Sequence, residues 1–98
     1  NNAFGKEALL NNLTGTNNNA FGYSALLTNT GGSHNVAMGY GALLNNKATG
    51  NTAIGFGSLL TNTTGAVNVA VGYQAALTGQ GDYGVSLGFQ TGQYNQGE

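Results

Sequence analysis

The chain has 98 residues and no cysteine, which excludes disulfide bonds and thiolate metal sites. Charged residues make up 5% of the sequence and the formal net charge is -1, so there is no basic patch of the kind that binds nucleic acid. No apolar run approaches the roughly 20 residues of a membrane-spanning helix, and we expect no membrane insertion.

One unit is repeated along the whole chain. Two clear copies are NTAIGFGSLL, residues 51–60, and NVAVGYQAAL, residues 68–77. The central glycine recurs every 16 or 17 residues, at Gly5, Gly22, Gly39, Gly55, Gly72 and Gly88. The predicted repeats are therefore residues 1–17, 18–34, 35–50, 51–67, 68–83 and a degenerate copy at 84–98. We expect residues 1–98 to form a single module, a fragment of a longer fibrous protein, since the chain begins inside a repeat.

Alternation within each unit predicts one short strand per repeat. In residues 35–41, Val36, Met38 and Tyr40 share one face, while Ala37, Gly39 and Gly41 share the other. Strands from successive repeats would stack in parallel at about 4.8 Å per coil. The predicted fold is all-β, a parallel β-solenoid (β-roll) of about six repeats of 16–17 residues.

Two columns of large side chains follow from this stacking. The first is Phe4, Phe21, Met38, Ile54, Val71 and Leu87, and the second is Tyr23, Tyr40, Phe56, Tyr73 and Phe89, with Lys6 as its exception. Because the same position recurs in every repeat, we expect these side chains to stack and pack rather than to bind a ligand. As part of the core, Tyr40 would contribute about 3 kcal/mol to stability.

The Ala-Leu-Leu segment after each strand is expected to continue the strand or to form an irregular turn. A half-turn of helix is the alternative, because the first copy, KEALLNN, has good helix propensity. Adjacent leucines on an extended segment point to opposite faces, so only one column of each pair can enter the core. The other would be an association stripe; the two columns are Leu26, Leu43 and Leu59, and Leu27, Leu44 and Leu60.

Residues suited to catalysis or metal binding are few and scattered. The acids are Glu7, Asp82 and Glu98, and the only imidazole is His34. A threefold axis would bring three copies of His34 together, but a histidine ring without carboxylates behind it is a poor metal site. The Gly79–Gly81 stretch lacks the Lys-Ser/Thr signature of a phosphate loop, so it is interpreted as a turn. We expect no catalytic residues, no metal and no cofactor.

The repeated N-[TV]-A-[IVM]-G-[YF]-x-[AS]-L unit resembles the repeats of phage tail fibres. It is also similar to β-roll repeats in the heads of trimeric autotransporter adhesins, whose period is shorter. The resemblance implies a homotrimer, on a virion or extracellular at a cell surface, used for host attachment or as a spacer. It implies that a host-surface glycan or protein would be met through other domains.

Two other functions fit the composition. Richness in Asn, Gln and Gly with low charge is also typical of an amyloid-like extracellular polymer. An ice-binding solenoid is the least favoured, because the threonines of the Thr-Gly pairs lie in turns of unequal length rather than at a fixed strand position.

Overall fold

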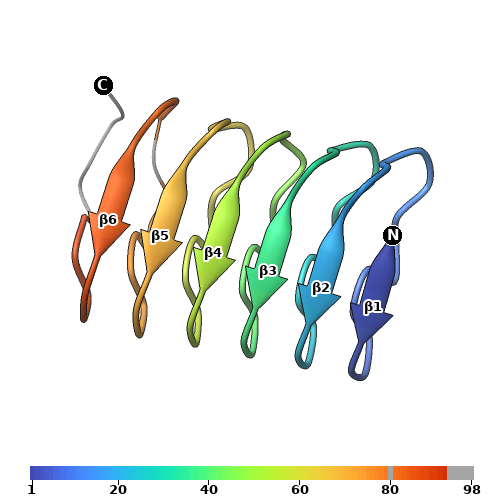
Figure 1. Ribbon diagram of the computed structural model, residues 1–98, viewed down its shortest axis with the longest axis horizontal. Coiled ribbons are helices and arrows are strands. Elements are labelled where there is room, and N and C mark those ends of the chain that lie inside the picture. Colours follow the sequence, from blue (N-terminus) through green and yellow to red (C-terminus); the bar gives the residue numbers. More distant parts are fainter. Residues whose placement is uncertain (80, 93–98) are drawn as a thin grey trace.

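The computed structural model describes residues 1–79 and 81–92 and confirms the predicted architecture, a parallel β-solenoid of about five turns. Residues 93–98 of the last predicted repeat, and residue 80 of the Gly79–Gly81 turn, lie outside the described residues. The described part contains no helix. Its six strands form one sheet in chain order (Figure 1): β1 Asn2–Phe4, β2 Asn19–Phe21, β3 Val36–Met38, β4 Thr52–Ile54, β5 Val69–Val71 and β6 Val85–Leu87.

Equivalent residues of successive repeats lie directly beside one another. The central strand residues pair as Ala20 with Ala37 and Ala37 with Ala53, and each strand runs parallel to its neighbour. The repeat period therefore equals one coil of the solenoid, and each sequence column becomes a row along the fibre axis. This parallel stacking is what the spacing of the glycines predicts.

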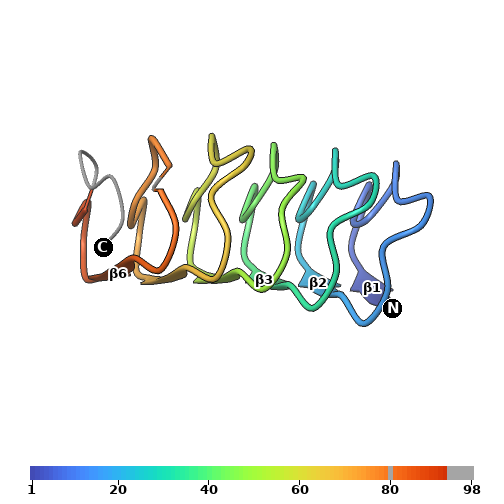
Figure 2. The ribbon, with the colours of Figure 1, turned by 90° about the horizontal axis from the view of Figure 1, so that it is seen from above.

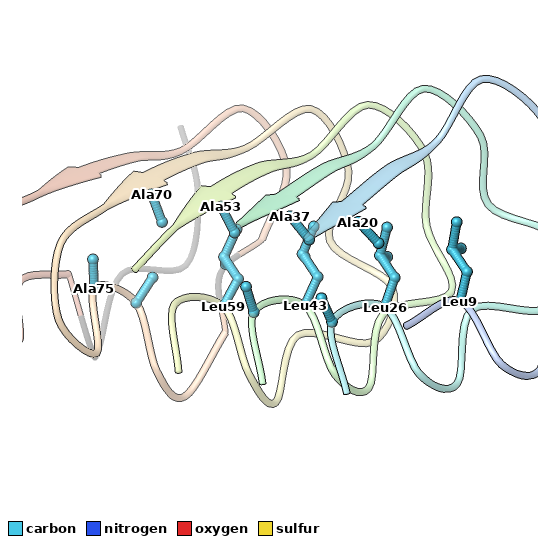
Figure 3. Packing of buried hydrophobic residues seen from close by; sticks show 12 residues of the cluster. Leu9, Ala20, Leu26, Ala37, Leu43, Ala53, Leu59, Ala70 and Ala75 are labelled. Atoms are coloured by element: carbon cyan, nitrogen blue, oxygen red, sulfur yellow. The ribbon is translucent and has the colours of Figure 1, made fainter. Parts of the chain in front are cut away.

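The core is built from small residues of the sheet and leucines of the opposite wall. Alanines at the centres of β2 to β5 are fully buried, and Figure 3 shows them facing a row of leucines from the turn segments. This leucine row is Leu9, Leu26, Leu43 and Leu59, of which the last three are fully buried. The expectation that the large strand residues occupy the core is wrong. A coil of 16–17 residues is so thin that alanine and leucine fill the space between its walls.

The Ala-Leu-Leu segment forms a series of tight turns, as seen in the zigzag wall opposite the strands (Figure 2). In the third coil, Ala42 N donates to Gly39 O at 3.2 Å and Leu44 N donates to Gly41 O at 3.1 Å. Between these turn bonds, Leu43 N donates to Ser58 O of the next coil at 3.0 Å. Alternate amides thus close turns and join coils, and the helical alternative is not observed.

The glycine that marks each repeat is required by the backbone. Gly39 has a φ of 130°, a region that only glycine adopts readily. A Cβ atom at Gly39 would lie 2.7 Å from Gly55 O in the next coil. The same close approach recurs along the column, so glycine is needed for both conformation and coil spacing.

Buried asparagines close each coil on the side away from the tight turns. One column precedes the strands and a second follows the leucine segment, and in the third coil these are Asn35 and Asn46. Both amides donate to the same carbonyl, Ala48 O, with Nδ2 to O distances of 2.9 and 2.8 Å. In the second coil Gly32 O accepts from two asparagines in the same way. The columns are Asn18, Asn35, Asn51 and Asn68, and Asn29, Asn46 and Asn62.

This shared carbonyl explains how coils of unequal length stack. The accepting residue follows the second-column asparagine by three positions in the coil that contains Asn29 and by two in the coil that contains Asn46. The extra residue lies in the turn between the two asparagine columns, while the carbonyl remains bonded to both. The strands on either side keep their register.

Candidate functional site

The outward side of the sheet carries a row of large apolar side chains. The third residue of each strand points away from the core, opposite to the buried alanine before it. We call this row the outer column; Met38 is 43% exposed, and the full set is Phe4, Phe21, Met38, Ile54, Val71 and Leu87. These side chains line the surface of the solenoid and not its core.

An aromatic ladder runs beside the outer column. Its members lie two residues after those of the outer column, and the hydrogen bonds between coils continue past them, from Gly41 N to Tyr23 O at 2.9 Å. Neighbouring rings have centroids 5.0 to 5.5 Å apart and are inclined by 11° to 16°. The ladder consists of Tyr23, Tyr40, Phe56, Tyr73 and Phe89.

The stacking determines which part of each ring is available. Tyr40 stacks on Tyr23 on one side and on Phe56 on the other, yet its side chain is 52% exposed. Its two ring faces are therefore occupied, and the ring edge and the hydroxyl point to the outside. Phe4 and Phe21 of the outer column stack in the same manner, with centroids 5.0 Å apart. The predicted stacking is present, but at the surface, so the expectation that Tyr40 is a core residue is wrong.

The predicted leucine columns separate into two environments. Leu26, Leu43 and Leu59 are fully buried and belong to the core. The other column, Leu27, Leu44 and Leu60, is half-buried and forms a narrow stripe on the turn segments.

Glycines lie beneath this leucine stripe in two coils. A Cβ atom at Gly41 would lie 3.3 Å from Leu60 Cδ1, so the leucine packs over that glycine. Part of each stripe leucine is thereby covered within its own chain. Leu10, at the start of the stripe, is 61% exposed.

The buried asparagines were missed by sequence reasoning, which assigned Asn to solubility and turns. Asn18, Asn35, Asn51 and Asn68 are completely buried, and each accepts a hydrogen bond from the backbone of the next coil. A signal was present in the sequence, because asparagine stands at a fixed distance before the glycine in successive repeats. A position that is polar in every repeat is as informative as one that is apolar in every repeat.

Titratable residues do not gather in the described part of the chain. Within residues 1–79 and 81–92 no three His, Cys, Asp or Glu side chains are close enough to hold a metal ion. His34 is exposed in a turn, with a φ of 60°, and its backbone N donates to Thr16 O at 3.0 Å. The outer column and the aromatic ladder are therefore the most distinctive surface of this structure, and together we call them the outer face.

No protein-family model, no curated protein and no solved structure matches this chain. In the part of the chain that the structure describes, there is no helix long and apolar enough to cross a membrane.

Proposed function

We propose that this chain is a structural segment of a trimeric fibre, such as a phage tail fibre, that spaces or presents a host-attachment tip. The observation that carries the proposal is the in-register stacking of six strands, which repeats each surface feature along one axis. A surface that repeats in this way suits a shaft better than a unique binding site.

The variable residues support a role as a shaft. Differences between coils are concentrated in the turns, such as residues 31–34, while the strands and core repeat with small changes. Recognition of a host glycan or protein would then depend on those turns or on other domains of the fibre. A bacterial surface adhesin would use the same segment in the same way.

An amyloid-like polymer is the second candidate, favoured by the parallel, in-register stacking and the aromatic ladder. The two functions differ in their end state. A trimeric fibre segment has a fixed mass, whereas a polymer grows without limit.

Light scattering and sedimentation of the 98-residue chain, together with thioflavin fluorescence, separate these functions. We expect a discrete particle with three times the mass of one chain and no lag-phase growth of thioflavin signal. A folded monomer at micromolar concentration would refute the trimer. Fibrils of indefinite length would favour the polymer.

A further inference from the structure

The outer face is an apolar surface with nothing over it in the isolated chain. Its side chains, six in the outer column and five in the aromatic ladder, are each between 37% and 68% exposed. We infer that in the assembled fibre the outer face is covered by the outer face or flank of another copy of this chain. The inference rests on the proposed fibre function and identifies the surface that joins its chains.

The area of the outer face is sufficient for a stable contact. A large aromatic side chain has roughly 200 Å² of surface, so half-exposed side chains in these two rows present about 1,000 Å² of apolar area. The largest apolar patch on an ordinary monomer is about 300–600 Å². A stable protein interface buries about 800 Å² on each partner. The outer face therefore exceeds what a monomer usually exposes and matches what an interface requires.

The stacking of the rings narrows the choice of partner. Sugar rings and cations bind to the flat faces of aromatic rings, and those faces in the ladder are taken by neighbouring rings 5.0 to 5.5 Å away. Only Lys6 brings charge to these rows, so phosphate groups of lipids or nucleic acids have little to bind. What remains available is a row of ring edges and aliphatic groups, which fits another apolar surface.

A second copy fits this surface in its spacing as well as in its chemistry. Two parallel copies have rows with the same interval along the fibre axis, so a contact made by one coil is repeated by the next. The leucine stripe offers less, because Leu44 and Leu60 are already half-buried within one chain. The outer face is therefore the main joining surface, in place of the leucine columns indicated by the sequence.

A charged pair placed on the outer face tests the assignment. Met38 and Ile54 are neighbours in the strand register, so Met38→Lys combined with Ile54→Glu puts opposite charges side by side without repulsion. The matched control is Leu44→Lys with Leu60→Glu on the leucine stripe. Circular dichroism measures folding, and sedimentation measures mass.

We expect the Met38/Ile54 variant to be folded and monomeric, and the Leu44/Leu60 variant to keep the mass of the unmodified chain. The reverse result, or a Met38/Ile54 variant that still assembles, would overturn the inference while leaving the fibre proposal intact. If the unmodified chain is itself a folded monomer, the proposed trimer and this inference both fail.

A second measurement needs no substitution, because Met38 is the single methionine of the chain. Dilute hydrogen peroxide converts an accessible methionine to its sulfoxide, and mass spectrometry follows the rate. We expect oxidation of Met38 in the assembly to be at least about fivefold slower than in the chain unfolded in guanidinium, since 43% exposure alone would slow it only about twofold. Weaker protection would show that the outer face is uncovered.

Discussion

Replacing Asn35 with alanine removes two hydrogen bonds that join successive parts of the solenoid. Asn35 Oδ1 accepts from the backbone N of Asn51 at 2.8 Å, and Asn35 Nδ2 donates to Ala48 O at 2.9 Å. Ala48 O keeps its bond from Asn46, but Asn51 N is left in a fully buried residue without an acceptor. An unsatisfied buried amide costs about 1–3 kcal/mol, and the lost second bond and the small cavity bring the total to about 3 kcal/mol.

Denaturant unfolding followed by circular dichroism, at one fixed chain concentration, measures this loss. The matched control is Asn45→Ala in the same coil, where the side chain is half-buried and the backbone bond from Asn45 N to Leu60 O is unaffected. We expect the control to cost less than about 0.5 kcal/mol. Equal losses in the two variants, or a loss below about 1 kcal/mol for Asn35→Ala, would refute the structural role of the buried asparagines.

Asn35→Asp adds a test of the direction of the bonds. An ionised aspartate can accept from Asn51 N but cannot donate to Ala48 O, and its charge is buried. Burial raises the pKa of such a carboxyl, so the folded state favours the protonated form. The destabilisation should therefore be greatest above the raised folded-state pKa and should decrease as the pH falls, relative to the unmodified chain at each pH. A loss that does not decrease in acid would contradict this arrangement.

Three further substitutions test other parts of the structure by the same unfolding measurement. Gly39→Ala should cost at least about 3 kcal/mol, because φ is 130° and the new Cβ would meet Gly55 O, whereas Gly31→Ala, at an exposed turn glycine without positive φ, should be nearly neutral. Tyr40→Ala should cost about 1.5 kcal/mol, half of what a core ring would, and Tyr40→Phe should cost almost nothing because it keeps both stacks; a loss near 3 kcal/mol would place the ring in a buried site. Val67→Asn should stabilise the chain by about 1 kcal/mol, since the valine has a φ of 57° that asparagine tolerates better, and any destabilisation would contradict the assigned strain.

Much of the fold could be predicted from the sequence because the repeat constrains it so strongly. Six glycines at intervals of 16 or 17 residues define the coil, and alternation around Ala37 defines the strand. Parallel in-register stacking follows, since only that arrangement places every equivalent residue in the same surroundings. The turns of the Ala-Leu-Leu segment were among the alternatives for the same reason of length.

Which face of the strand lies inside could not be predicted from alternation. Alternation separates Met38 from Ala37 but assigns neither to the core, and the usual rule that large apolar residues are buried gave the wrong side. The deciding quantity is the distance between the walls of a thin coil, where Ala37 and Leu43 together fill the space. That distance depends on the zigzag turns, whose positive φ at a bulky residue such as Leu43 has no sequence signature.

The candidate surface was located in sequence but placed wrongly in space. Tyr40 and its equivalents were expected to stack, and they do, with two neighbours each in the middle of the ladder. Their exposure follows from the inversion of the strand faces. Whether the outer face or the leucine stripe joins the chains stays a prediction until the paired charge variants are measured.

The carbonyl bonded by two asparagines also makes each coil an interchangeable unit of inheritance. Tandem repeats in a gene recombine out of step, which removes or duplicates stretches of whole-repeat length. Here such an exchange joins one turn to an equivalent turn, and the clamp accepts either the longer or the shorter version, as Gly32 and Ala48 show. The product keeps its core, its glycine column and its outer face, and its length changes in steps of about 4.8 Å. Variation in shaft length is therefore available to this protein without the invention of any new fold.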